Sequence, residues 1–188
     1  MLALLALLAC AKDPSSIPQV QTGGDPVPSV SPAPGNGVTE SPFSVEQLRS
    51  GFAVGTKIRL AINAVGEPER FEQWDITATD ASGMTIASRS YAADGSLLKD
   101  DGSGTSTWEE LRMHAVFPAS QTVREEVKLT TDLGEFDCWL YTVVDPQSDT
   151  VKRLWFAKTL PGPPLLFTIV AGKGTVFEMR TVGREPLP

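Results

Sequence analysis

The fold class follows from one extended stretch, Glu135-Phe136-Asp137-Cys138-Trp139-Leu140-Tyr141-Thr142-Val143-Val144. Side chains alternate between the two faces of a β-strand, so Cys138 and Leu140 lie on one face and Trp139 and Tyr141 on the other. A solvated antiparallel sheet needs only one apolar face. We therefore expect both faces of this strand to be covered.

The stretch 151–158 has the same two-sided character, with Trp155 and Phe156 on opposite faces. A tight polar loop at 145–149 joins the two stretches, which predicts an antiparallel hairpin. We expect a helix beginning after Thr107 to cover one face. The other face is covered either by a second layer of a strongly curved or barrel-like sheet or by an apolar cavity. In the cavity case, the candidate lining residues are Trp139, Tyr141, Trp155 and Phe156.

The hairpin belongs to a longer series of alternating segments. Strands are expected over 57–62, 71–79, 84–91, 122–130, 135–144, 150–158, 165–171 and 175–182. Residues 92–104 predict a polar connection, with a short strand near Leu97 as the alternative. Short connections favour antiparallel neighbours. We expect a mainly β (α+β) domain, built as a curved antiparallel meander or half-barrel of about eight strands with two short helices.

The two helices have recognisable starts. Ser44 followed by Gln47, and Thr107 followed by Glu110, fit capping boxes, in which each partner satisfies a free N–H group of the other. Gly51 predicts the end of the first helix. The second is expected to continue to about Val116, before the Pro that follows.

The chain begins with an apolar run that is too short to span a membrane. Its end, Leu7-Leu8-Ala9-Cys10, resembles the lipobox of bacterial lipoproteins. The resemblance implies a signal peptide over 1–9, a lipid on Cys10 and attachment to a membrane of the bacterial envelope. Ala11, rather than Asp, follows the Cys, and in that family this favours the outer membrane facing the periplasm.

Residues 10–42 differ in composition from the rest of the chain. They hold seven of its fifteen prolines and no apolar periodicity, which predicts a disordered tether ahead of a globular domain over 43–188. The chain has two cysteines. If Cys10 carries the lipid, Cys138 has no partner for an internal disulfide and is expected to be a buried, inert thiol.

Composition excludes several kinds of partner and activity. The net charge is −7 and there is no Lys/Arg-rich block, so we expect no nucleic-acid partner. The single histidine, His114, lies one helical turn after Glu110, and two ligands do not make a metal site. Asp94, Asp100 and Asp101 do not have EF-hand spacing. We therefore expect a non-enzymatic protein without catalytic residues, metal or cofactor.

A resemblance suggests what such a domain does. The strand Gly134–Tyr141, the strand Arg153–Lys158 and the Pro-Gly-Pro-Pro run at 161–164 are similar to domains of bacterial envelope lipoproteins. The helix and the aromatic meander are similar to LolA/LolB-like half-barrels, which shelter an acyl chain. This implies a domain that binds an apolar or acyl ligand on the inner face of its sheet. The alternative is a structural lipoprotein that docks on an envelope protein.

Overall fold

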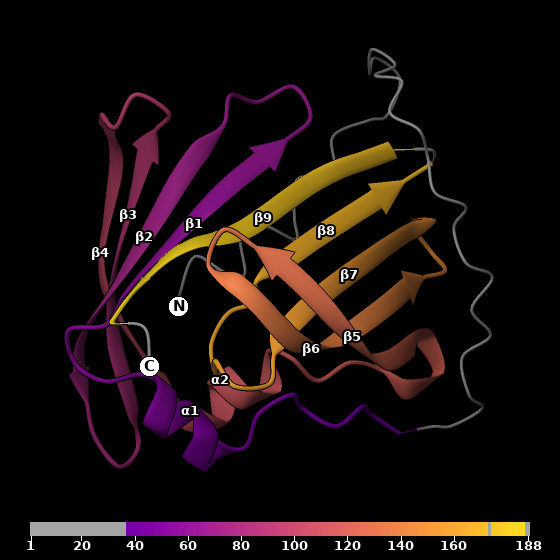
Figure 1. Cartoon of the computed structure of the whole chain (residues 1–188), viewed down its shortest axis with the longest axis horizontal. Helices are drawn as coiled ribbons and strands as arrows, with labels where there is room; N and C mark the ends of the chain where they lie inside the picture. The colour runs from indigo at the N-terminus through magenta and orange to yellow at the C-terminus, as the bar shows by residue number, and fades with distance from the viewer. Residues whose placement is uncertain (1–36, 173, 187–188) are drawn as a thin grey trace.

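The computed structural model describes residues 37–172 and 174–186, and Cys10 and the signal peptide predicted over 1–9 lie outside this range. The described chain forms one open antiparallel sheet of nine strands with two short α-helices, which confirms the expected fold class. The strand order is β4-β3-β2-β1-β9-β8-β7-β6-β5, so β9 pairs with β1 and joins the two halves of the meander. Figure 1 shows the sheet strongly curved, with both helices at one end.

The element bounds are close to those expected for most of the chain. The helices are α1 (Val45–Gly51) and α2 (Trp108–Met113), with a 3₁₀ turn at Ala119–Gln121. The strands are β1 (Lys57–Ala64), β2 (Arg70–Thr79), β3 (Gly83–Ala92), β4 (Leu97–Thr107), β5 (Thr122–Thr131), β6 (Gly134–Asp145), β7 (Thr150–Ala157), β8 (Leu166–Ala171) and β9 (Gly174–Glu185).

The region 92–104 differs from the main expectation. A polar connection was expected there, but β4 occupies most of it as an edge strand paired with β3. Only a short turn separates the two strands, in which Asp94 accepts from the Ser96 N–H (2.9 Å) and Gly95 has a φ of 85°. An edge strand exposes much of its surface, so polar residues are tolerated and the apolar alternation that identifies a strand is missing.

Both capping boxes are present. The Ser44 hydroxyl accepts from the Gln47 N–H (3.2 Å), and the Thr107 hydroxyl accepts from the Glu110 N–H (3.1 Å). In each case the N3 side chain accepts the N–H of the cap residue in return. The first helix ends at Gly51 as expected, whereas the second stops at Met113 instead of continuing to about Val116.

The main core lies on the face of the sheet that both helices contact, which we call the inner face. It joins strands from both halves of the meander, with Ile58, Leu60 and Ile62 wholly buried. Apolar side chains of α1 and α2 close it at the helical end. Its buried members are Phe43, Leu48, Phe52, Ile58, Leu60, Ile62, Trp74, Ile76, Met84, Ile86, Trp108, Ala115, Tyr141, Phe156 and Met179.

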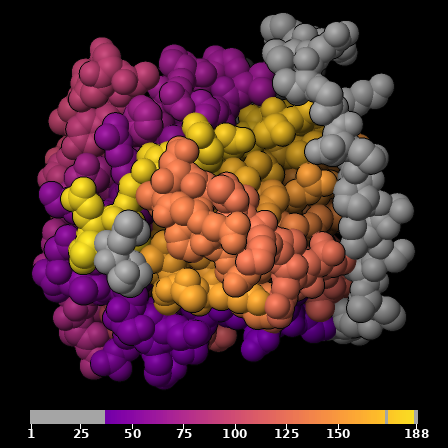
Figure 2. Space-filling model, viewed as in Figure 1, coloured from indigo at the N-terminus to yellow at the C-terminus, as the bar shows by residue number. Residues whose placement is uncertain are grey.

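A second, smaller core lies against the other face of the β6–β7 hairpin. It contains Cys138, Ala157, Leu160 and Leu165, with partly buried side chains from the β5–β6 hairpin packed on it. Figure 1 shows that hairpin crossing in front of β7 and β8, and Figure 2 shows its residues spread over the centre of this surface. Both faces of the β6–β7 hairpin are therefore covered, which explains its apolar character on both sides.

Residues 37–42, assigned from the sequence to the end of the tether, contact the domain. Val38 forms an isolated bridge with Pro118, and the Thr39 N–H donates to the Phe117 carbonyl (2.8 Å). The Tyr141 hydroxyl donates to the carbonyl of Glu40 (2.7 Å). The described chain thus enters the domain beside the start of β5.

Candidate functional site

The four aromatic residues expected to line a cavity do not share a face. Trp139, Tyr141 and Phe156 lie on the inner face, with Trp139 paired to Phe156 across β6 and β7. Trp155 lies on the opposite face and packs against the second core. The structure therefore brings three of the four together.

Two of these three residues fill the core. Tyr141 is wholly buried and Phe156 is 4% exposed. Their rings meet edge to face with centroids 5.7 Å apart, and Phe43 packs edge to face on Phe156 at 6.0 Å. Burial raises the pKa of the Tyr141 phenol to about 12, so its hydroxyl remains a hydrogen-bond donor. These contacts stabilise the helical end of the inner face.

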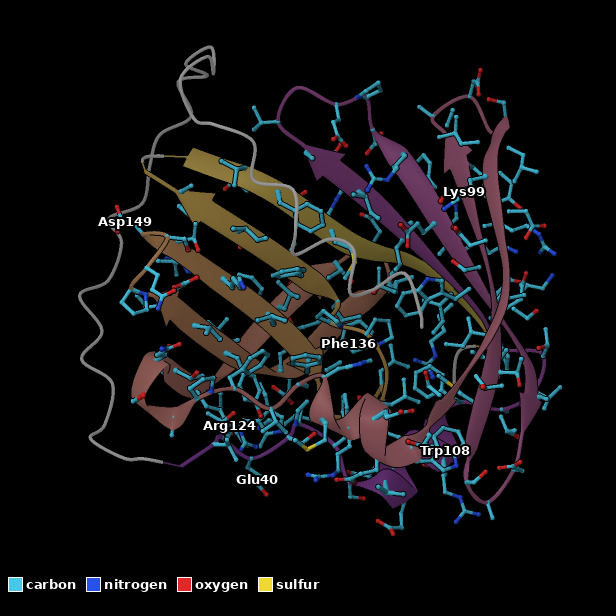
Figure 3. The ribbon with its side chains drawn as sticks, turned by 180° about the vertical axis from the view of Figure 1, so that it is seen from behind. Glu40, Lys99, Trp108, Arg124, Phe136 and Asp149 are labelled. Carbon is cyan, nitrogen blue, oxygen red and sulfur yellow. The ribbon has the colours of Figure 1, made fainter. Side chains whose placement is uncertain are left out.

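Trp139 is only partly buried, and cations surround its ring. The guanidinium carbon of Arg124 lies 3.8 Å and the ammonium of Lys158 lies 4.0 Å from the ring centroid. Arg124 also pairs with Glu40 (2.7 Å) and Lys158 with Glu126 (2.6 Å). Figure 3 labels Arg124 and Glu40 close together beside the sheet. The cluster holds Trp139 by cation–π contacts in a charge-balanced setting.

Beside the main core, the inner face of β6–β9 carries partly exposed apolar side chains that form an apolar wall. We use this name for the partly buried side chains Trp139, Leu154, Phe167 and Phe177, which pack against the main core. Phe167 pairs with Leu154 on β7 and with Met179 on β9. The rings of Phe167 and Phe177 are 5.4 Å apart. The sequence predicts that these strands are apolar, but it does not show which of their side chains remain partly exposed in the folded domain.

On the other half of the sheet, the inner face changes from core residues such as Trp74, Ile76 and Ile86 to polar side chains farther from the helices. Its register places Glu72 of β2 beside Leu60 of β1 and Ser90 of β3, and Ser90 beside Lys99 of β4. We call Glu72, Ser88, Ser90, Lys99 and Asp101 the polar wall; Figure 3 labels Lys99 on this half of the sheet. Glu72 is half-buried, and burial raises the pKa of its carboxyl group, with the charge of Arg70 and a side-chain hydrogen bond with Trp74 acting in the opposite direction.

Sequence reasoning did not select Glu72 as a candidate. The available signal was its strand parity, because Glu72 alternates with Trp74 and Ile76 and so shares their inward face. A carboxylate at a position of core parity is costly unless it gains a partner. A perturbed carboxyl group on a concave face is a recognised indication of a functional site.

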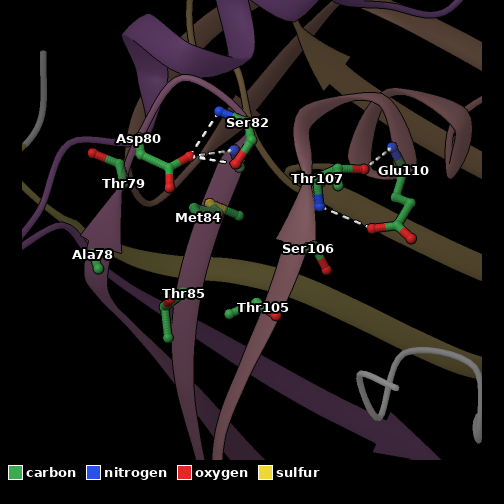
Figure 4. Close-up of a pocket in the computed structure, with 11 residues that line it drawn as sticks. Ala78, Thr79, Asp80, Ser82, Met84, Thr85, Thr105, Ser106, Thr107 and Glu110 are labelled. Atoms are coloured by element: carbon green, nitrogen blue, oxygen red, sulfur yellow. Dashed lines mark hydrogen bonds between the residues drawn. The ribbon is translucent and has the colours of Figure 1, made fainter.

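Two surface pockets lie elsewhere, near the turn between β2 and β3. The first, about 500 Å³ in volume, is lined mainly by hydroxyl groups and by the carboxylates of Asp80 and Glu110 (Figure 4). One oxygen of Asp80 accepts the N–H groups of Ser82 and Gly83 (2.7 and 3.0 Å). Glu110 accepts the Thr107 N–H (2.8 Å). These bonds explain both carboxylates as parts of a turn and a helix cap.

No family model, curated protein or solved structure matches this chain. In the described ranges, no three side chains of the His, Cys, Asp and Glu types are grouped so that they could hold a metal ion. Neither α1 nor α2 combines the length and apolar character that crossing a bilayer requires. Cys138 is fully buried, and burial raises the pKa of its thiol to about 11. The partly exposed apolar wall and the half-buried Glu72 make the inner face our candidate site.

Proposed function

We propose that this chain is a membrane-anchored envelope lipoprotein whose β domain holds an apolar or acyl ligand on the inner face of its curved sheet. The observation that carries the proposal is the apolar wall, where four large side chains remain partly exposed on a concave face. The lipobox-like Leu7–Cys10 segment supplies the anchor in this proposal. One end of the inner face is filled by core side chains, so the ligand is expected at the other end.

Ligand binding can be tested on a chain with Cys10→Ala, which removes the acylated thiol. The protein is purified without detergent, examined by native mass spectrometry and extracted with organic solvent. Recovery of a lipid, or saturable binding of a lipophilic dye that Phe167→Ala weakens, supports the proposal. A lipid-free protein that binds no dye contradicts it.

The anchor needs a separate experiment. Cells expressing the wild-type chain or Cys10→Ala are labelled with a palmitate analogue, and the protein is then isolated. We expect label on the wild-type chain only, in a membrane fraction. Label that persists in the Cys10→Ala chain would contradict lipidation at this residue.

A second candidate function is docking on an envelope protein. It is favoured by the open sheet, whose terminal strands β4 and β5 each pair with a single neighbour in the described chain. A sheet edge offers free N–H and C=O groups to an added strand. Photo-crosslinkers placed at exposed Thr105 of β4 or Glu125 of β5 should then trap one specific neighbour in native membranes. The absence of any specific adduct would count against docking at the edges.

A further inference from the structure

We propose that the inner face binds a phospholipid with an amine-bearing head group, placing the amine at Glu72 and the acyl chains along the apolar wall. The inference rests on the proposed function and specifies its ligand class. It is carried by the division of the inner face into a polar wall on β2–β4 and an apolar wall on β6–β9.

The carboxylate of Glu72 is the first element of the argument. It is half-buried on the inner face, and no ion pair to it is found among the described residues. The nearby basic groups have other partners, since Arg70 pairs with Glu67 (2.9 Å) and Lys99 pairs with Asp101. The charge of Arg70 and a side-chain hydrogen bond with Trp74 lower the pKa of this carboxyl group, but burial outweighs both. An ammonium group would therefore stabilise the half-buried carboxylate further.

Arg70 extends this complementarity to a phosphate. It lies two residues before Glu72 on the same face of β2, and a guanidinium matches the oxygens of a phosphate. Its partner Glu67 is largely exposed, and exposed ion pairs contribute little stability. A phosphate could therefore replace Glu67 as the partner of Arg70 with little loss of free energy. Glu72 and Arg70 together present both charges that a zwitterionic ethanolamine head group requires.

The dimensions of the inner face fit such a molecule. Three strand spacings separate β2, which carries Glu72, from β8, which carries Phe167, and at about 4.8 Å each they give about 14 Å. Because Leu60 and Ile62 are wholly buried, we expect the acyl chains to cross β1 and β9 at the partly exposed pair Ala64 and Phe177. This is close to the depth of about 15 Å that the acyl chains of one leaflet fill in a bilayer. When the head group lies at Glu72, the acyl chains are therefore long enough to reach Phe167 and Phe177.

The test compares two phospholipids that differ only in the head group. The Cys10→Ala chain is incubated with vesicles containing equal amounts of ethanolamine and glycerol phospholipids with identical acyl chains. Bound lipids are then counted by native mass spectrometry. We expect a preference for the ethanolamine lipid of about tenfold, the factor expected from one charge-assisted hydrogen bond. Glu72→Gln should reduce this preference to about threefold or less.

Glu178→Gln is the matched control, because Glu178 lies on the outer face of β9, next to the inward-facing Met179. This variant should keep the full preference. Phe167→Ala should weaken binding of both lipids and leave their ratio unchanged. Equal binding of the two lipids, or an unchanged ratio in Glu72→Gln, would overturn the head-group assignment and leave the proposed function standing. Failure to bind either lipid would contradict the proposed function itself.

Discussion

At the scale of single residues, the polar groups of the inner face differ in whether the protein itself satisfies them. The Tyr141 hydroxyl donates to the Glu40 carbonyl, and the Trp108 indole N–H donates to the Asp80 carbonyl (3.0 Å). These groups are parts of the scaffold. Glu72 forms no ion pair in the described chain, and Arg70 and Trp74 offset the effect of its burial only in part, so its carboxylate remains available to a ligand.

Tyr141→Phe tests the scaffold role of the hydroxyl. The change keeps the aromatic packing with Phe156 and removes the hydrogen bond to Glu40, so we expect a loss of about 1 kcal/mol in the free energy of unfolding. Urea denaturation measures the loss. Tyr91→Phe on β3 is the matched control and should change stability by less than about 0.5 kcal/mol. Equal effects of the two substitutions would contradict the assignment.

Glu72→Gln should alter how stability depends on pH. Burial raises the pKa of Glu72 above that of the unfolded chain, although Arg70 and a side-chain hydrogen bond with Trp74 oppose this and Asp101 adds to it. The protonated form therefore favours folding, and this stability is present at low pH and lost as pH rises through the folded-state pKa. Glutamine cannot ionise, so the Glu72→Gln chain does not lose this stability as pH rises.

The measurement is the melting temperature of both proteins at about pH 4 and about pH 7.5, on either side of the expected change. Glu72→Gln should gain stability relative to the wild-type chain at the higher pH. The Glu178→Gln control should show no such gain. If the wild-type chain gained relative stability as pH rose, Glu72 would have to be paired in the folded state.

At the scale of secondary-structure elements, local signals predict some features and miss others. Both capping boxes are confirmed because their hydrogen bonds join residues three positions apart. Only a short strand near Leu97 is predicted where β4 lies, because the defining hydrogen bonds of β4 go to β3 and its own residues are polar and rich in glycine. The end of α2 was placed too late because continuation of a helix depends on its packing as well as on its sequence.

Thr107→Ala tests the cap of α2. It removes the oxygen that accepts the Glu110 N–H, and we expect a loss of about 1 kcal/mol in the free energy of unfolding. Thr107→Ser keeps an acceptor at the same place and should restore most of the loss. Thermal or urea denaturation of the three proteins decides the question. If Thr107→Ser were as unstable as Thr107→Ala, the methyl group of Thr107, and not its capping hydroxyl, would be what stabilises the domain.

At the scale of the whole molecule, two cores on opposite faces share one sheet. The main core spans both halves of the meander, whereas the second core involves β5–β7 and the segment around Leu160. Strands β6 and β7 contribute residues to both cores. Loss of one core should therefore destabilise the other, and the domain should unfold in a single transition.

Leu160→Ala tests this coupling. Leu160 is 4% exposed in the second core, and truncation of a buried leucine costs about 2–5 kcal/mol. We expect far-UV circular dichroism and tryptophan fluorescence to shift together to a lower urea concentration. Fluorescence reports on Trp155 at the second core and on Trp74 and Trp108 in the main core. Separate transitions for the two probes would show that the cores unfold independently.

The sequence by itself determined the antiparallel, mainly β class, most strand positions, the two helix starts and the two-sided burial of the β6–β7 hairpin. These properties depend on alternation, turn residues and caps, which are local. Only the tertiary structure decided the pairing of β9 with β1, the position of β4 at the edge, and the separation of Trp155 from Trp139, Tyr141 and Phe156. It also placed Glu72 on the same inner face as the apolar wall. The physical reason is that strand parity fixes which residues share a face within one strand, whereas register and curvature decide which faces of distant strands meet.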